Sequence, residues 1–502
     1  MGRWSRRYTA TVAISSLLIC GTFYRFRNTN APYDLATSFD DPATFAELAD
    51  EQVQIIHPDP QLYPTDAPKL TIVAIWNPGT SSPLYLPNFF SSVAGNPTID
   101  VLFIKDDRHE VGCDAPLAPA IPNLREVCLS SEEYWGLHAD FLCEQWGGCS
   151  EHDRNRVMSK MRDRRWGDRV HAYFRPFRHE IFRRWLHPAT PIWGVCDMDV
   201  VLGNFERNFP WDEALQYDIV FPSSPMDHED VLVYIPGHLA FFANSHHLTE
   251  EFMTFPGVRT LDGFLSEPWM DSGAPDEAEW SHWAFTHTDL TFLRFPGLVV
   301  GQFHVSVPGA GVFSIDNAGY WTAMNRVTEP GHNRIRAALY WAAQQRARAP
   351  RKALFSSGGT ERHVELRDGA AEGFLWFPQR FAVDVLVPPE LITADWWQTK
   401  RFLMRRERGG PVVYRTEPMF ADDWFVLPVE AFSDAYAPSV GFPMHAHDML
   451  YNHFQVEKYT EWWKLPGLPA RALGADEVLY VDKDRGAWVW DARGRVVFSA
   501  VL

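Results

Sequence analysis

The sequence predicts an α/β fold in which helices flank a sheet of mainly buried strands. One observation is an alternation of short apolar runs with amphipathic segments, which begins at Leu70 and is typical of strand–helix–strand units. Another is the apolar run Ile192–Cys196, which ends directly in Asp197 and Asp199. The chain closes with short strand-like runs, so we expect a β-rich addition after the α/β part.

Composition supports a globular protein and argues against a nucleic-acid partner. Hydrophobic residues make up 46% and charged residues 22% of the 502 residues, close to the globular average. Lys and Arg total 46 against 64 Asp and Glu, a net charge of -18 that opposes binding to a phosphate backbone. The 21 Trp residues are mainly expected in the core, with stacking on flat or ring-shaped ligands as a second use.

The N-terminus has the pattern of a membrane anchor. The segment 9–23 carries no charge and has arginines on both sides. A signal anchor and a cleaved signal peptide both fit this length, and the absence of a small-x-small cleavage site favours the anchor. Residues 1–27 are therefore predicted to form a cytosolic tail and a transmembrane helix, and residues 28–69 a stem. The rest would face the lumen of the Golgi or endoplasmic reticulum as a type II membrane protein.

Four cysteines lie close together and predict one or two disulfides. They are Cys113, Cys128, Cys143 and Cys149. Three pairings are possible, and the sequence does not choose among them. A zinc site is the weaker interpretation because no C-x-x-C pair is present.

The first strand–helix–strand unit is expected over residues 70–107. Leu70–Trp76 is rich in branched apolar residues, as in a buried strand. Ser82 can cap a helix that begins with Pro83 and ends before Gly95. A second strand follows at Ile99–Ile104 and leads into Asp106 and Asp107.

Further elements define the predicted domains. A helix is expected at 177–186, and strands at 192–196, 218–222 and within 231–244. We assign 70–330 to a catalytic core and 331–470 to an accessory region that returns to the core near 445–458. Residues 471–502 contain three apolar runs separated by Asp- and Gly-containing turns, which predicts a three-stranded meander.

The Asp-x-Asp pair is the main functional signal. Side chains two residues apart in an extended segment point the same way, so Asp197 and Asp199 can share one cation. Ligands of α/β sheets bind at the carboxyl ends of strands, which is where this pair lies. Carboxylate oxygens suit Mg²⁺ or Mn²⁺, and such an ion can bridge the phosphates of a nucleotide.

The segment Trp193–Asn204 resembles the W-G-x-x-D-x-D-x-x-x-G-D/N core of GT-A-type glycosyltransferases from polysaccharide-synthesis clusters. The resemblance continues in order to about Lys458. It includes Leu86–Phe90, Asn96–Asp100 with Asp106–Asp107, Phe174–Pro176, Gly237–Asn244, Asp276–Trp280 and Tyr451–Lys458. The chain departs from the family in a much longer region between Trp283 and Met449 and in the additional C-terminal meander.

The resemblance implies a GT-A-like (Rossmann-like) mixed sheet and a nucleotide-sugar-dependent transferase that acts on a glycan or glycoconjugate. It implies that Mn²⁺ or Mg²⁺ is bound by Asp197, Asp199 and His453, although clustered loop histidines are often only solvated. The implied donor-binding residues are Asp197, Asp107, Trp193, His238 and Lys458. Asp276 or Glu277 could deprotonate the acceptor hydroxyl, or could belong to a solvated acidic turn.

Two other function classes fit parts of the sequence. An apolar strand followed by D-x-D also describes haloacid-dehalogenase-type phosphatases, with Asp197 as nucleophile and Asp422–Asp423 as a magnesium pair. In that fold the nucleophilic strand usually comes first, whereas a complete strand–helix–strand unit precedes it here. A non-catalytic lectin-like module on a transferase fold is the third hypothesis, and the two intact aspartates argue against it.

Overall fold

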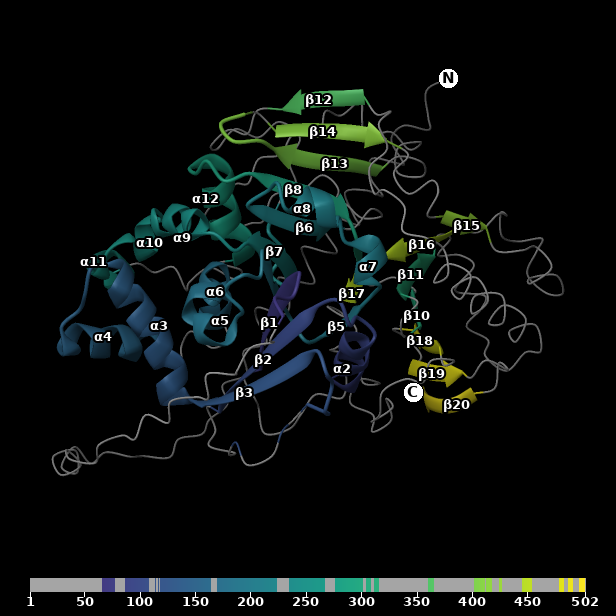
Figure 1. Cartoon of the computed structure of the whole chain (residues 1–502), viewed down its shortest axis with the longest axis horizontal. Helices are drawn as coiled ribbons and strands as arrows, with labels where there is room; N and C mark the ends of the chain where they lie inside the picture. Colours follow the sequence, from purple (N-terminus) through teal and green to yellow (C-terminus); the bar gives the residue numbers. More distant parts are fainter. Residues whose placement is uncertain are drawn as a thin grey trace, which may run out of the picture. The chain divides into compact units, whose positions relative to one another are not determined.

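The computed structural model describes residues 66–76, 86–107, 113, 116, 118–163, 169–223, 234–266, 276–300, 304–307, 311–315, 360–364, 401–410, 412–417, 424–426, 445–453, 478–482, 486–490 and 496–501 (Figure 1). All of them belong to one compact unit, Pro60–Leu502. The predicted anchor lies outside these residues, as do nearly all of the predicted stem, Lys458 and the Asp422–Asp423 pair. No helix within the described ranges is long and apolar enough to span a bilayer.

The largest sheet is mixed, as the predicted α/β fold requires. Its strand order is β12-β14-β13-β8-β6-β7-β4-β1-β2-β3. The strands are β1 (Leu70–Trp76), β2 (Asp100–Asp107), β3 (Leu124–Ser130), β4 (Ile192–Cys196), β6 (Ile219–Ser223), β7 (Leu239–Ala243), β8 (Phe292–Pro296), β12 (Thr360–Val364), β13 (Arg401–Arg406) and β14 (Val412–Glu417). Strands β3, β2, β1 and β4 run parallel, whereas β7 is antiparallel to both β4 and β6 (Figure 1).

Helices cover both faces of this sheet because its strands are apolar on both faces. Alternate residues of β1 enter different cores: Ile72 and Ala74 pack on one face and Val73 on the other. The Ile72 face is covered by α2 (Leu86–Ala94), α7 (Phe205–Asn208) and α8 (Trp211–Ala214). The Val73 face is covered by α3 (Ser131–Gln145), α4 (Glu151–Arg162), α5 (Arg169–Tyr173), α6 (Arg178–Ile181), α9 (His246–Met253), α10 (Pro256–Arg259), α11 (Leu261–Ser266) and α12 (Ser281–Thr286).

The longest described helix, α3, begins with a capping box. The Ser130 side chain accepts a hydrogen bond from the Glu133 N–H, and the Glu133 carboxylate accepts one from the Ser130 N–H. Two of the predicted disulfides form. Cys113 pairs with Cys128 in β3, before the helix, and Cys143 in the last turns of α3 pairs with Cys149, which follows the helix. The structure thus selects one of the three possible pairings.

The continuous helix predicted at 177–186 is wrong. The chain instead makes three short turns: η2 (Arg175–Phe177), α6 and η3 (Arg183–Trp185). Side chains are buried around most of this segment, including Phe177, Phe182 and Trp185. Tertiary packing therefore sets its backbone, because there is no single apolar face to guide a regular helix.

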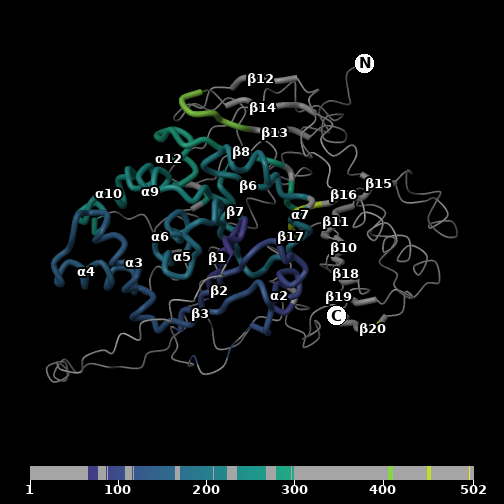
Figure 2. Tube along the Cα trace, in the orientation of Figure 1, coloured from purple at the N-terminus to yellow at the C-terminus, as the bar shows by residue number. Residues whose placement is uncertain are grey.

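Two smaller sheets join late segments to early ones. In Figure 2 the late, yellow trace of residues 449–453 lies beside the early helix α7. One of the two sheets has the order β15-β16-β11-β10-β18-β19-β20: β10 (His304–Val307), β11 (Gly311–Ile315), β15 (Trp424–Val426), β16 (His445–Met449), β18 (Val478–Asp482), β19 (Gly486–Trp490) and β20 (Val496–Val501). Here β18, β19 and β20 form the expected meander, and β18 pairs with β10. The other has the order β5-β17-β9: β5 (Val200–Leu202), β9 (Leu298–Val300) and β17 (Tyr451–His453).

Candidate metal centre

The Asp-x-Asp pair lies where β4 leaves the main sheet. Strand β4 is fully buried between β1 and β7, and its ladder with β7 ends at Cys196. The Asp197 N–H then donates to the His238 carbonyl oxygen at 3.0 Å, so the turn is anchored as the chain leaves the sheet. Strand β5 begins at Val200, directly after Asp199.

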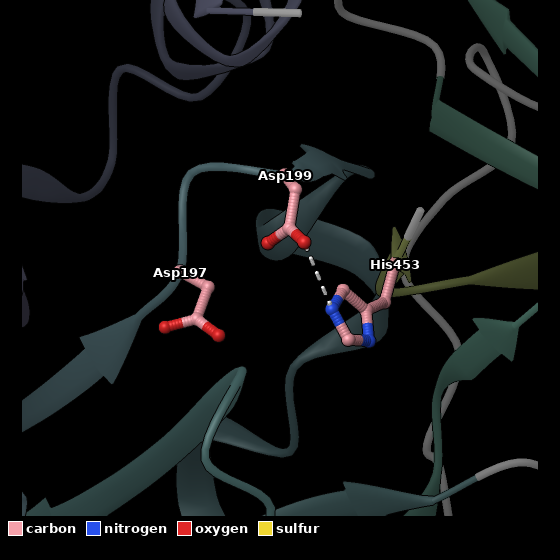
Figure 3. Close-up of side chains that lie close together, drawn as sticks. All are labelled: Asp197, Asp199 and His453. Carbon is pink, nitrogen blue, oxygen red and sulfur yellow. Dashed lines mark ion pairs between the residues drawn. The ribbon is translucent and has the colours of Figure 1, made fainter. Parts of the chain in front are cut away.

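His453 reaches this pair from a distant part of the sequence. Strand β17 pairs antiparallel with β5, and the register places His453 opposite Val200. His453 Nε2 lies 3.4 Å from Asp199 Oδ2 (Figure 3). Potential ligand atoms of Asp197, Asp199 and His453 all lie within 4.8 Å of one another. The structure thus brings together the three residues that the sequence predicts as metal ligands.

These three side chains fit a divalent cation. Two carboxylates and one imidazole provide the oxygen and nitrogen donors that Mn²⁺ accepts and that Mg²⁺ accepts in part. Neither ring nitrogen of His453 makes a hydrogen bond within the described structure, although the side chain is only 5% exposed. A buried imidazole of this kind is costly unless it finds a partner, and a cation next to Asp199 would provide one.

The ring of His453 is held by His238, which Tyr451 fixes in turn. The His238 ring stacks on it, with 4.2 Å between ring centroids. A hydrogen bond of 2.6 Å joins the Tyr451 hydroxyl to His238 Nδ1. His238, predicted to bind the donor, thus lies buried against a candidate metal ligand.

Arg175 is a residue of this site to which the sequence analysis gave no role. Its guanidinium donates to Asp197 Oδ1 at 2.7 Å. Arg175 starts the η2 turn, which precedes β4 in the chain. The Phe174–Pro176 motif marked the segment, but a single arginine beside a proline gives no local indication of its partner.

Glu277 lies close enough to the same charged groups for them to change its pKa. Its Oε1 accepts a hydrogen bond from the Gly237 N–H at 3.1 Å. Burial raises the pKa of Glu277, and nearby Asp197 adds to this, whereas the Gly237 N–H and the charges of Arg175 and His453 oppose it. Asp276 is the first residue of the neighbouring π-helix η6 (Asp276–Trp280), of which the structure describes only the backbone at this position.

Cys196 is a buried free cysteine beside the aspartates. Its thiol donates to the Asp197 carbonyl oxygen at 2.9 Å. Burial, followed by the charges of Asp197 and Asp199, raises the pKa of this thiol well above its ordinary value. The sulfur therefore stays protonated and is not a reactive thiolate.

Of the remaining predicted donor-binding residues, the structure describes Trp193 and Asp107, and neither belongs to the three candidate metal ligands. Trp193 is 1% exposed, and its ring stacks between His179 and Phe242 at centroid distances of 4.6 and 4.5 Å. It therefore packs in the core rather than at the sheet edge. Asp107 ends β2 on the same sheet edge as Asp197, because β2, β1 and β4 are parallel. Lys458 is outside the described residues.

Asn96 and Gly203, two further residues of the family motifs, hold the chain where β5 ends. The Asn96 side chain donates to the Gly203 carbonyl at 2.7 Å and accepts from the Phe205 N–H at 2.9 Å. A side chain at Gly203 would meet the carbonyl oxygens of Met449 and Leu450, which lie just before β17. These residues support the geometry of the site without contacting its three candidate ligands.

Comparisons with known proteins add little to this geometry. No family model matches the chain, and no curated protein matches it. Among solved structures, it is similar to the crystal structure of mouse xyloside xylosyltransferase 1 in its apo form. That likeness has 9% identity and a TM-score of 0.22, and covers 39% of this chain and 80% of the other. At this level it carries no functional argument.

Proposed function

We propose that this chain is a glycosyltransferase that moves a sugar from a nucleotide-sugar donor to a hydroxyl group of a glycan or glycoconjugate. The observation that carries the proposal is the Asp197–Asp199–His453 group at the carboxyl end of β4. In α/β sheets this edge is where ligands bind. A group of two carboxylates and an imidazole can hold a divalent cation there.

The residues around the group have complementary tasks in this proposal. When bound, Mn²⁺ or Mg²⁺ would supply positive charge against the diphosphate leaving group. Glu277 is the candidate base for the acceptor hydroxyl, because its raised pKa makes its carboxylate a stronger proton acceptor than an ordinary glutamate. Asp276 remains a second candidate base, and Asp107 and Lys458 remain candidate donor contacts.

Metal titration of single variants tests the first step. We expect Asp199→Asn and His453→Ala each to weaken Mn²⁺ binding by more than about a hundredfold, since even residues behind the ligands can cost 10–100-fold. Isothermal titration calorimetry measures this. Asp262→Asn removes an exposed carboxylate of α11 and is the matched control. Wild-type Mn²⁺ affinity in Asp199→Asn would contradict the proposed metal site.

A panel of nucleotide sugars tests the reaction class. Specific binding stabilises the folded state by about 2.7 kcal/mol at a hundredfold excess over Kd, which raises the melting temperature measurably. We expect one or a few nucleotide sugars to do so in the presence of Mn²⁺ and not in Asp199→Asn. Hydrolysis of a generic phosphate ester that is lost in Asp197→Asn would instead indicate a phosphatase. Glycan binding without nucleotide or metal would indicate a lectin-like module.

The proposal includes a lumenal location, with the anchor predicted in residues 1–27. The pairs Cys113–Cys128 and Cys143–Cys149 support it, because disulfides persist in oxidising compartments. We expect the full chain to stay with membranes after alkaline carbonate extraction and its catalytic part to resist protease in sealed vesicles. Release of the chain by carbonate would contradict the predicted membrane anchor but would not bear on the proposed glycosyltransferase reaction.

A further inference from the structure

Among the three candidate ligands, Asp197 has the side chain that is most open to solvent. The side chains of Asp199 and His453 are each 5% exposed, whereas that of Asp197 is 34% exposed. Arg175 lies on this more exposed side and donates to Asp197 Oδ1 at 2.7 Å. An anion that approaches the metal from solvent would therefore arrive beside the Arg175 guanidinium.

Arg175 also supplies charge that the metal alone does not. The two aspartates cancel both charges of a divalent cation, so the loaded group would be close to neutral without further cations. Arg178 lies three residues later, at the start of α6, and its charge interacts with that of Asp197. It is buried and donates to the Val73 carbonyl oxygen at 3.2 Å, so it is held within the fold. In a chain of net charge -18, Arg175 and Arg178 thus bring two positive charges close to Asp197.

We infer that Arg175 binds the diphosphate of the donor at this more exposed side, while it also orients Asp197. The inference rests on the proposed function, and it names the residue that meets the leaving group. A guanidinium offers a planar set of donors that can contact a phosphate while one N–H remains on Asp197. One oxygen of Asp197 is then fixed by Arg175, and the other can face the cation.

The test compares metal binding with diphosphate binding in the same variants. Inorganic pyrophosphate is the probe, because it carries the diphosphate charge without depending on the base or the sugar. We expect Arg175→Ala to weaken pyrophosphate binding to Mn²⁺-saturated protein by at least about tenfold, the effect of losing one charge-assisted contact. Its Mn²⁺ affinity without pyrophosphate should change by a smaller factor, because Arg175 orients Asp197 but its positive charge also opposes the cation. The pyrophosphate affinity of Arg175→Lys should lie between those of wild type and Arg175→Ala, because an ammonium keeps the charge but loses the planar geometry.

Arg183→Ala is the matched control, because Arg183 is 60% exposed and pairs with Glu144 instead. Wild-type pyrophosphate affinity in Arg175→Ala would overturn the inference. So would a loss of Mn²⁺ affinity as large as the loss of pyrophosphate affinity, because Arg175 would then only position Asp197. Failure of the proposed function looks different: the wild-type protein itself would show no Mn²⁺-dependent pyrophosphate binding. Circular dichroism and the melting temperature of each variant report whether it is folded.

Discussion

At the scale of single residues, Glu277 connects burial to a pH dependence. Burial raises its pKa, so its carboxylate forms only at a higher pH than in an ordinary glutamate. If Glu277 is the base, kcat/KM should fall as the pH drops through this raised pKa and reach a plateau above it. Glu277→Gln should lower kcat by about 10²–10⁴-fold, the usual contribution of a general base, while Mn²⁺ affinity stays near wild type. A pH–rate series on both proteins measures this.

Glu250→Gln is the control for that experiment, because Glu250 is 62% exposed and pairs with the surface residue His246. It should leave the pH profile unchanged. If Glu277→Gln keeps wild-type kcat, the base is another group. Asp276 would then be the next residue to replace.

Tyr451 tests how far the metal centre depends on residues behind its ligands. Its hydroxyl bonds to His238 Nδ1, and the His238 ring stacks on His453. Tyr451→Phe removes the bond and keeps the buried ring. We expect Mn²⁺ affinity to fall by about tenfold, at the lower end of the range for residues that orient metal ligands. Calorimetric titration measures it, with Tyr217→Phe as a control away from the three ligands.

An unchanged Mn²⁺ affinity in Tyr451→Phe would mean that packing alone orients His453.

The residues of the site differ in how well the sequence predicts them. Asp197 and Asp199 are recognisable locally, because two polar residues follow a buried apolar strand. His453 required the family resemblance, and Arg175 had no recognisable signal, because its partner lies 22 residues away through turns that no periodicity describes.

At the scale of elements, Gly203 controls how β17 meets β5. Its N–H donates to the Leu450 carbonyl oxygen at 2.6 Å, and an added Cβ would lie 2.8 Å from that oxygen. Gly203→Ala should therefore push β17 away from β5, and with it His453 away from Asp199, which directly precedes β5. We expect a destabilisation of about 1–3 kcal/mol, typical of overpacking, and a loss of Mn²⁺ affinity of more than about tenfold.

Gly136→Ala is the matched control in this experiment. Gly136 is buried in α3, and an added Cβ there would meet only the end of the Arg154 side chain at 3.1 Å. Denaturant unfolding and Mn²⁺ titration compare the two variants. If Gly203→Ala is destabilised but keeps its Mn²⁺ affinity, the β5–β17 contact supports the fold without setting the metal geometry.

The elements that the sequence predicts well are those with a local cause. Strands β1 and β4 match their apolar runs, and α2 ends at Ala94, just before Gly95. The helix predicted at 177–186 was wrong because burial around most of the segment leaves no helical period to detect. The antiparallel insertion of β7 between β4 and β6 could not be predicted, because strand order depends on contacts between distant segments.

At the scale of the whole molecule, the strands cross the domain boundaries expected from the sequence. Strand β13 extends the main sheet from β8, and β18 joins β10. Strand β17 lies between β5 and β9, within the segment 445–458 that the sequence predicts to return to the core. Each of the three sheets thus contains strands from both sides of the predicted boundary at residue 330. Sequence reasoning placed the boundary where the pattern of apolar runs weakened, and a weaker pattern does not reveal which earlier strands the later ones will join.

This interleaving predicts that the chain can be divided at residue 330 without losing its assembly. We expect co-expressed fragments 60–330 and 331–502 to co-purify through a tag on either one, because unpaired strand edges in each fragment are satisfied by the other. The complex should bind Mn²⁺, whereas fragment 60–330 alone should not bind with comparable affinity, because it lacks His453. Co-expression with a 331–502 fragment carrying His453→Ala separates assembly from metal binding: the fragments should still associate but bind Mn²⁺ weakly. Fragments that purify separately, or a lone 60–330 fragment with full Mn²⁺ affinity, would show that the late strands are dispensable to the metal centre.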